Sequence, residues 1–296
     1  MLKVLCQAFF QESRVSPIPK KSQRKVPMKK IIATDYDGTL NYGGIKPHVV
    51  EAIARFRAEG NLFGVVTGRD KGGSLDVFRK EGQFGFDFVL ALNGALAFDA
   101  DGNMLYDVPV DGSRRYGDTT LSRALTRRIW ELTGFHVGIA FSDGSRMDIH
   151  PDYPDGGQIR WTRVMPFTDL EKDVFARMDT FAQLNTICES EEKATEVTAV
   201  LKKEFGEYVN PFQNGICIDI PAAGMDKGEA VARYAARMGV AEENIYTAGD
   251  NYNDLAMLER FNGCAMANGV DAVKAVSKYV CRDIAEVVDI AMGHGK

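Results

Sequence analysis

Short apolar segments alternate with amphipathic ones along most of the chain from residue 28 onward. The segments KIIATD (30–35), LFGVVTG (62–68) and FDFVLALNG (86–94) are apolar on both faces and predict buried strands, and KPHVVEAIARFRAEG (46–60) predicts a helix that ends at glycine. The same alternation returns as strand, helix, strand, helix and strand at 243–250, 254–261, 263–269, 270–278 and 279–281. Strands of this kind, joined by helices, form parallel sheets covered on both sides. The two outer portions are therefore expected to form one α/β domain with a doubly wound, Rossmann-like parallel sheet.

The middle of the chain has a different pattern. FHVGIAF (135–141) and RMDIH (146–150) are joined by the turn SDGS, which predicts an antiparallel hairpin. The remaining elements expected there are helices at 120–134, 167–176 and 191–206 and strands at 180–189, 208–212 and 215–220. Helices combined with antiparallel strands predict an α+β module. We therefore expect this module at 108–220, inserted into a core domain formed by 28–107 and 221–296.

The first 27 residues are basic, contain prolines and have little apolar surface to bury, so a disordered extension is expected; a membrane-binding arm is the functional alternative. Residues 1–30 carry eight Lys or Arg and one acid, in a chain whose net charge is −5. The rest of the chain therefore has a net charge of −12, which argues against a nucleic-acid partner for the folded body. No apolar run approaches the roughly 20 residues needed to cross a bilayer, so no membrane partner is expected.

Composition and cysteine usage bound the class of protein. With 296 residues, 45% of them hydrophobic and 26% charged, the chain can bury a sizeable core and is long enough for two domains. Its five cysteines form no C-x-x-C pair, and an odd number is more typical of reduced thiols than of a disulfide framework. A cytoplasmic protein is therefore expected.

Acidic residues follow the predicted strands at the edge where a doubly wound sheet binds ligands. Asp35 and Asp37 come after the first strand, Thr67 after the second, and Asp250 after IYTAG. Three carboxylates at one edge would repel each other unless a cation lies between them, and oxygen-only ligands favour Mg²⁺. Mg²⁺ in turn favours a phosphate-bearing substrate, because the ion bridges carboxylate and phosphoryl oxygens.

The residue types around this edge suit phosphoryl transfer. One carboxylate of DYDG can attack phosphorus, and its partner two residues away can protonate the leaving oxygen and later deprotonate water. Thr67 and Gly68 can donate hydrogen bonds to phosphoryl oxygens, and Lys227 can balance charge at the start of a helix whose expected N-cap is Asp226. A calcium loop is disfavoured, because an EF-hand needs glycine at position 6 and here glycine stands at position 4.

Four short segments carry a family resemblance. DYDGTL, VVTGR, MDKGEAV and GDNYNDLAML resemble, in this order, the four motifs of the haloacid dehalogenase superfamily. NYND and the tail AMANGVDAVKAVSKYV resemble its Cof-like phosphatases, in which an α+β cap of type IIB lies between motifs II and III. The resemblance covers nearly all of residues 28–283, with strong motifs in the core and weak ones in the cap. The chain departs from it at Leu92, where similar proteins often carry glutamate before NGA, and in the segment CRDIAEVVDIAMG.

The resemblance implies a role for each motif residue. Asp35 would be the nucleophile that forms an aspartyl-phosphate, and Asp37 would be the general acid and base. Mg²⁺ would be held by the Asp35 carboxylate, the Asp37 backbone carbonyl and Asp250. Asp254 would orient Lys227 or a metal-bound water. The residues that would meet the phosphate group are Tyr36 through its N–H, Thr67, Gly68, Lys227 and Asn253.

The function expected from these residues is Mg²⁺-dependent hydrolysis of a small phosphomonoester, with sugar phosphates as one candidate class. Two alternatives stay open: a phosphotransferase or phosphomutase of the same fold, and a non-catalytic sensor of a phosphorylated ligand. The expected partner is a small phosphorylated metabolite, and no oligomeric state is predicted. The cap arginines Arg146, Arg160 and Arg163 could contact a second anionic group of the substrate, although a solvated surface role is more common for such residues.

Overall fold

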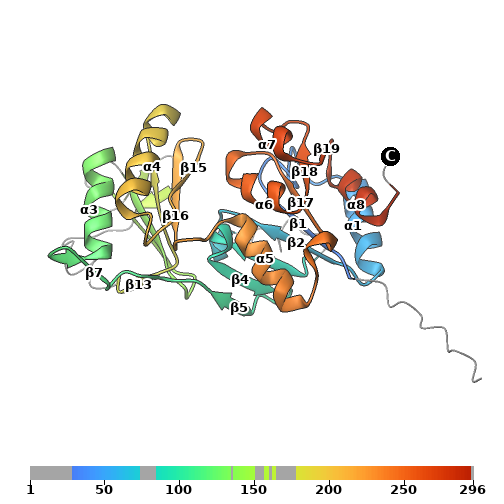
Figure 1. Ribbon diagram of the computed structural model, residues 1–296, viewed down its shortest axis with the longest axis horizontal. Helices are drawn as coiled ribbons and strands as arrows, with labels where there is room; N and C mark the ends of the chain where they lie inside the picture. Colours follow the sequence, from blue (N-terminus) through green and yellow to red (C-terminus); the bar gives the residue numbers. More distant parts are fainter. Residues whose placement is uncertain are drawn as a thin grey trace, which may run out of the picture.

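The computed structural model describes residues 29–73, 85–134, 136–150, 157–159, 162–164 and 178–294. The expected extension at 1–27 and the helix predicted at 167–176 lie outside the described residues. The described chain forms two lobes, a core built around one large sheet and a cap built around a smaller one (Figure 1). The core is made from the two outer portions of the chain, and the cap is made from its middle.

The core sheet has eight strands in the order β19-β18-β17-β1-β2-β3-β4-β5. Neighbours from β19 to β3 are parallel, whereas β4 and β5 form an antiparallel hairpin at one edge. The parallel doubly wound sheet is confirmed, and the β4–β5 hairpin is an addition that the sequence pattern did not predict. The bounds are β1 Ile31–Thr34, β2 Leu62–Val66, β3 Phe88–Ala91, β4 Leu96–Asp99, β5 Met104–Asp107, β17 Ile245–Gly249, β18 Asn262–Met266 and β19 Tyr279–Cys281.

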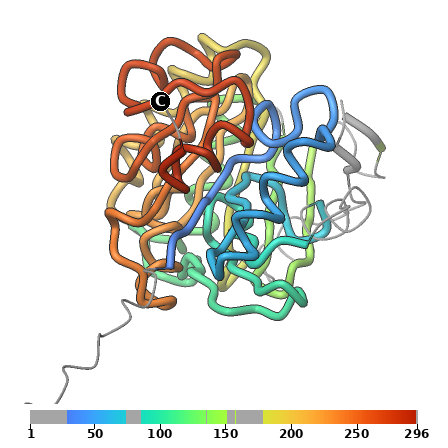
Figure 2. Tube along the Cα trace, turned by 90° about the vertical axis from the view of Figure 1, so that its right-hand side faces the viewer, coloured from blue at the N-terminus to red at the C-terminus, as the bar shows by residue number. Residues whose placement is uncertain are grey.

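Side chains along the central strands alternate between two hydrophobic clusters, one on each face of the sheet. In β1, Ile31 and Ala33 belong to one cluster and Ile32 to the other, and all three are fully buried. Helices α1 and α8 cover the face of Ile32, and helices α5, α6 and α7 cover the opposite face (Figures 1 and 2). Burial on both faces explains why these strands are continuous apolar runs. The helix bounds are α1 Pro47–Ala58, α5 Lys227–Met238, α6 Leu255–Arg260, α7 Asp271–Val276 and α8 Ile284–Met292.

The cap contains a five-stranded antiparallel sheet in the order β10-β9-β14-β16-β15. Helices α3 and α4 pack against one face of this sheet, on the side away from the core (Figure 1). The predicted hairpin is confirmed, because β9 and β10 pair antiparallel. The bounds are α3 Leu121–Thr133, β9 Val137–Ala140, β10 Arg146–Ile149, β14 Gln183–Ile187, α4 Glu191–Phe205, β15 Phe212–Asn214 and β16 Cys217–Pro221.

The described part of the cap also contains three short antiparallel strand pairs. They are β6 (Val110–Asp111) with β13 (Thr180–Phe181), β7 (Arg115–Tyr116) with β8 (Thr119–Thr120), and β11 (Gly157–Ile159) with β12 (Thr162–Val164).

The strand predicted at 208–212 is wrong in its placement. The N–H groups of Tyr208 and Val209 both donate to the Phe205 carbonyl, at 2.8 and 3.0 Å, and so finish helix α4 instead of starting a strand. The proline at position 211 has no N–H to donate to a sheet. Strand β15 therefore begins only at Phe212, and Val209 forms an isolated bridge with Ala222.

Strand β1 is the point at which the order of the core sheet reverses. From β1 the chain moves to β2 and β3 on one side, and after the cap it returns to β17, which pairs with β1 on the other side. The carboxyl ends of these strands meet at one edge, where the loops diverge and leave a crevice. Asp35, Thr67 and Asp250 directly follow β1, β2 and β17 at this edge.

Candidate active site

The loop after β1 is a tight turn that presses against the loop after β17. The Asp35 N–H donates to the Ala248 carbonyl at 2.8 Å, and only 7% of the Asp35 surface is exposed. Gly38 has a φ of +83°, and a Cβ there would lie 2.5 Å from the Asp250 Oδ2 atom. Glycine is required at this position, because any side chain would collide with the acid of the neighbouring strand.

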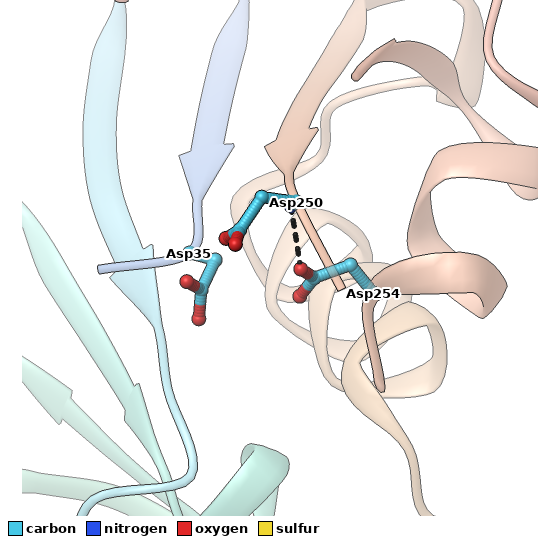
Figure 3. Close-up of side chains that lie close together, drawn as sticks. All are labelled: Asp35, Asp250 and Asp254. Carbon is cyan, nitrogen blue, oxygen red and sulfur yellow. Dashed lines mark hydrogen bonds between the residues drawn. The ribbon is translucent and has the colours of Figure 1, made fainter. Parts of the chain in front are cut away.

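Three carboxylates meet where β1 and β17 end. Asp35, Asp250 and Asp254 each offer an oxygen atom within 4.8 Å of the others (Figure 3). Asp254 lies in the 3-10 helix η6 (Tyr252–Asp254), and its Oδ2 atom accepts from the N–H groups of Asp250 and Asn251 at 2.9 and 3.0 Å. The motif NYND therefore folds into a short helical turn in which the carboxylate of Asp254 points back to the loop after β17.

Lys227 supplies the positive charge of this cluster. Its ammonium group is fully buried and donates to Asp35 Oδ1 and to Asp254 Oδ1, both at 2.6 Å. It is the first residue of α5, and Asp226 is the N-cap of that helix, as the sequence predicted. Burial lowers the pKa of Lys227, but the charges of Asp254 and Asp35 outweigh this effect and raise its pKa above the usual value. The lysine therefore remains charged beside the acids.

The acids of the cluster outnumber this lysine, and their pKa values reflect the imbalance. Burial raises the pKa of Asp35 well above its usual value; Asp254 and Asp250 add to the rise and Lys227 opposes it. Burial also raises the pKa of Asp250. A divalent cation between these oxygens would stabilise the ionised carboxylates. The donor set consists of oxygen atoms, so these residues fit a hard cation such as Mg²⁺.

Asp37 is held apart from this cluster by an arginine. Its carboxylate accepts two hydrogen bonds from the Arg69 guanidinium, at 2.6 and 2.8 Å, and its side chain is 59% exposed. The guanidinium also lies over the Tyr36 ring, 4.8 Å from the ring centroid. Arg69 therefore fixes the orientation of the candidate acid and base.

A cavity of about 860 Å³ lies between the core and the cap. The predicted site residues that line it on the core side are Asp35, Asp37, Thr67, Gly68, Asp250 and Asn253. Tyr36, Lys227 and Asp254 are fully buried next to this wall. The structure thus brings all the predicted residues to one site, while the role given to each stays a prediction.

The cap forms the opposite wall through alternate residues of its sheet. The intervening residues, such as Met147, Leu184 and Ile218, belong to the hydrophobic cluster under α3 and α4. The cap sheet is therefore apolar toward its helices and mainly polar toward the core. The cap residues that line the cavity are Arg146 and Asp148 of β10, Gln183, Asn185 and Ile187 of β14, Asn214 of β15, and Cys217 and Asp219 of β16.

Arg146 lies on the cavity wall, as one of three arginines that the sequence singled out in the cap. Its guanidinium donates to Asp148 at 2.6 and 2.7 Å and to Asn185 at 3.1 Å. It is therefore held within the cap sheet at a fixed orientation. Arg160 and the side chain of Arg163 lie outside the described part of the chain.

Sequence reasoning missed several side chains that shape the site. The Thr39 hydroxyl donates to Asp250 Oδ1 at 2.6 Å, and Arg69 binds Asp37; both lie inside the motifs DYDGTL and VVTGR, but neither was assigned a role. Asp219 was missed altogether. The signal for it was the alternation CIDI at 217–220, which places the acid on the face opposite the two isoleucines.

A family model for haloacid dehalogenase-like hydrolases matches residues 32–289, which include both lobes. The chain belongs to this hydrolase family. The membership suggested by the motifs is thereby confirmed, as is the expected enzyme class, a phosphoric monoester hydrolase of the haloacid dehalogenase type. Within the described residues, no helix of this hydrolase is both long and apolar enough to cross a membrane.

Two of the curated relatives of this hydrolase carry the following phosphatase names. The pyridoxal phosphate phosphatase YbhA of Escherichia coli is 29% identical over 279 residues, which cover 86% of this chain and 93% of the relative. The putative phosphatase YxeH of Bacillus subtilis is 27% identical over 268 residues, with coverages of 86% and 93%.

Solved structures share the fold of this hydrolase. A subclass IIB sugar phosphatase of the superfamily superimposes with a TM-score of 0.69 at 22% identity, covering 90% of this chain and 98% of that one. A Thermotoga maritima protein gives a TM-score of 0.67 at 21% identity, with coverages of 91% and 98%. These matches confirm the expected fold class over both lobes.

Proposed function

We propose that this protein is a Mg²⁺-dependent phosphatase that hydrolyses small phosphomonoesters through a phosphorylated Asp35. The observation that carries the proposal is the nearly buried Asp35 carboxylate, which lines the cavity and is paired with a fully buried Lys227 at the switch point of the sheet. Burying such a pair is costly, so its place at the wall of a large polar cavity favours a catalytic role over a structural one.

The first half-reaction would transfer the phosphoryl group to the protein. An Asp35 oxygen attacks phosphorus, the bond between phosphorus and the leaving oxygen breaks, and protonated Asp37 gives its proton to that oxygen. Lys227 and the Thr67 hydroxyl would balance the charge on the phosphoryl oxygens. Because Arg69 holds Asp37 in the structure, proton delivery requires the Asp37 side chain to turn from the arginine toward the substrate.

The second half-reaction would regenerate the free carboxylate. Water attacks phosphorus, ionised Asp37 accepts a proton from this water, and the bond between Asp35 and phosphorus breaks to release inorganic phosphate. Asn253 lines the same wall and would donate to a phosphoryl oxygen during both steps. One phosphomonoester and one water thus give one alcohol and one phosphate.

The proposed Mg²⁺ ligands are the Asp35 carboxylate, the Asp37 backbone carbonyl and Asp250. Asp254 is the third acid of the cluster, but its Oδ1 accepts from Lys227 and its Oδ2 from two N–H groups. We therefore assign Asp254 to the orientation of its neighbours. When bound, the ion would offset the repulsion between the carboxylates and the phosphoryl group.

The cap wall favours a hydroxylated substrate. Asn185, Arg146 and Asp219 bring amide, guanidinium and carboxylate groups to the cavity, and such groups pair with hydroxyl donors and acceptors. Among the described residues that line the cavity there is no aromatic side chain on which a pyridine ring could stack. We therefore propose a sugar or polyol phosphate as the substrate class, ahead of pyridoxal phosphate, which is named for the Escherichia coli relative.

The cytoplasm is the compartment that we propose for this enzyme. Within the described part of the chain, Cys188, Cys264 and Cys281 are free thiols. Free thiols of this kind are typical of a reducing compartment.

Phosphate release from a panel of sugar phosphates, polyol phosphates, nucleotides, pyridoxal phosphate and p-nitrophenyl phosphate tests the proposal. Each compound is assayed with Mg²⁺ and with EDTA. We expect release that requires Mg²⁺ and is fastest with a sugar or polyol phosphate. Release that survives EDTA would overturn the metal requirement, and the absence of release from every compound would favour the phosphotransferase or the phospho-ligand sensor.

A further inference from the structure

The turn that follows β3 has a strained backbone. Leu92, Asn93 and Gly94 are consecutive, with φ values of +50°, +54° and +97°, and the first two are the non-glycine residues with positive φ in the described chain. A Cβ at Gly94 would lie 2.0 Å from the Ala230 Cβ, so the turn is pressed against helix α5. Left-handed backbone in a leucine persists only where the surroundings hold it, and such strain is common at functional sites.

The backbone of this turn holds the loop at 67–69, which we call the phosphate loop. The Asn93 N–H donates to the Thr67 carbonyl at 2.8 Å, and the Leu92 N–H donates to the Arg69 carbonyl at 2.9 Å. These two hydrogen bonds hold the phosphate loop in place on both sides of Gly68. Turn and loop therefore form one unit.

The Asn93 side chain reaches from this unit to the cap. Its Nδ2 atom donates to Asp219 Oδ2 at 3.0 Å and to Gln183 Oε1 at 3.2 Å, and Gln183 Nε2 donates to Asp219 Oδ1 at 3.2 Å. A Cβ added at Gly68 would lie 3.3 Å from Asp219 Oδ2 and 3.5 Å from the Asn93 amide. The three side chains thus form a closed triangle that packs directly on the phosphate loop.

Two members of this triangle belong to the cap, and one belongs to the core. Gln183 and Asp219 lie on β14 and β16 and would move together with the cap, whereas Asn93 would stay with the phosphate loop. Asp219 is only 8% exposed, and its side-chain donors in the described chain are the Asn93 and Gln183 amides. The triangle is therefore complete only when the cap lies against the core.

We propose that Asn93 is a positioning residue that couples closure of the cap to the geometry of the phosphate loop. The proposal rests on the proposed function, because the loop matters for turnover only if it binds the phosphoryl group. Asn93 acts through Thr67 and Gly68 and need not touch the substrate itself. The NGA segment that directly follows Leu92 thereby gains a role.

A reciprocal exchange of the two side chains tests this coupling. Asn93→Asp keeps the size and tolerates positive φ, but it sets a second carboxylate against Asp219. Asp219→Asn removes the acid and sets amides against each other. The double variant restores one carboxylate facing one amide, and the Gln183 amide can rotate to serve the exchanged pair.

Turnover of the best sugar phosphate is the first measurement. We expect kcat/KM to fall about tenfold or more in Asn93→Asp, mainly through kcat because the phosphate loop acts in the transition state, and to recover most of this loss in the double variant. Asn93→Gly, which relaxes the turn and keeps its N–H, should also lose kcat. Wild-type kcat in Asn93→Asp and Asn93→Gly would overturn the proposal, as would a double variant that is no better than Asn93→Asp.

Asn61→Asp is the matched control, because Asn61 is a buried core asparagine that bonds only the backbone of Lys30 and Phe56 among the described residues. It should lower the thermal midpoint and leave kcat unchanged. A loss of kcat equal to that of Asn93→Asp would show that the effect is general destabilisation, and would overturn the proposal.

A second measurement needs no turnover and so separates this proposal from the proposed function. The unfolding free energies of wild type, both single variants and the double variant form a double-mutant cycle. The double variant should be more stable than the sum of the two single changes in unfolding free energy predicts. Additive effects would overturn the coupling even in an active enzyme. Non-additive unfolding free energies in a protein that hydrolyses none of the substrates would support the contact between Asn93 and Asp219. They would contradict only the proposed function.

Discussion

The two walls of the cavity are built in different ways. On the core side, the side chains directly follow parallel strands, so short motifs such as DYDGTL and GDNYND contain them. On the cap side, they occupy alternate positions of antiparallel strands at 146–148, 183–187 and 217–219. A strand end places one residue at one point, whereas a sheet face offers many equivalent positions. We therefore expect the core wall to set the chemistry and the cap wall to set the choice of substrate.

Asp35→Asn should have the largest effect and should act on all substrates alike. The amide keeps the size of the side chain but cannot attack phosphorus, so kcat should fall by about 10³-fold or more. Phosphate release at saturating substrate measures this fall. Asp101→Asn, at an exposed acid in the β4–β5 turn, should leave kcat unchanged. A variant at Asp35 that keeps a kcat close to that of Asp101→Asn would contradict the assignment of the nucleophile.

Lys227→Met should affect both stability and turnover, because it leaves Asp35 and Asp254 buried without their cation. Breaking a buried pair in this way costs about 3–5 kcal/mol of unfolding free energy. Urea unfolding without Mg²⁺ measures it. Lys202→Met, at an exposed position of α4, is the control and should be close to neutral. Equal unfolding free energies for the two variants would rule out the stabilising role of the buried lysine.

Asp219 gives the cap wall a pH dependence. Burial raises its pKa from 3.8 to about 6, so the folded protein binds this proton more tightly than the unfolded chain does. Stability from this group is therefore full below about pH 4 and is lost as the pH rises through 6, by about 3 kcal/mol in total. Asp219→Asn removes the loss, so its unfolding free energy relative to wild type should rise by that amount between about pH 4 and 7.

The control for this pH dependence is Asp99→Asn. The Asn103 side chain lowers the pKa of Asp99, so stability from Asp99 is lost as the pH falls and the variant should show the opposite slope. Parallel stability curves for wild type and Asp219→Asn would show that the Asp219 carboxyl titrates normally.

Asn185→Ala should have the smallest effect and should change substrate choice more than rate. It removes a polar group from the cap wall that also holds Arg146, so kcat/KM for the preferred sugar phosphate should fall about tenfold relative to p-nitrophenyl phosphate. Thr186→Val is the control on the opposite face of the same strand, where the hydroxyl donates to the His136 carbonyl at 2.5 Å. Thr186→Val should lower stability and leave the ratio of the two kcat/KM values unchanged. If Asn185→Ala also left this ratio unchanged, the cap wall would not determine the choice of substrate.

Much of the core could be predicted because local and tertiary requirements agree there. An apolar run predicts a buried strand, and an acid directly after it lies at the edge of the sheet where the site forms, as Asp35 and Asp250 do. The β4–β5 hairpin was missed although its turn carries a signal: the Asp99 carboxylate accepts from the N–H groups of Asp101 and Asn103 at 3.0 and 2.8 Å. No element was predicted in this segment, where each flanking strand has only four residues.

The contacts between the lobes could not be predicted from pattern. Asn93 and Asp219 are 126 positions apart, and neither belongs to a motif that points to the other. The pairing of Asp37 with Arg69 lies within the core and joins two recognised motifs, but it could not be predicted either, because only the fold brings the two residues together. Periodicity reports which face a residue occupies, but not which residue lies opposite it.

The sequence by itself determined the doubly wound core, the inserted α+β module and the set of acids, threonine and lysine at the ends of strands. These follow from rules that act over a few residues: apolar periodicity, caps, and the position after a parallel strand. Only the tertiary structure decided that Lys227 lies between Asp35 and Asp254, that Arg69 holds Asp37, and that Asn93 joins the phosphate loop to the cap. The reason is that such pairs form where elements distant along the chain pack together, and packing is set by the whole molecule.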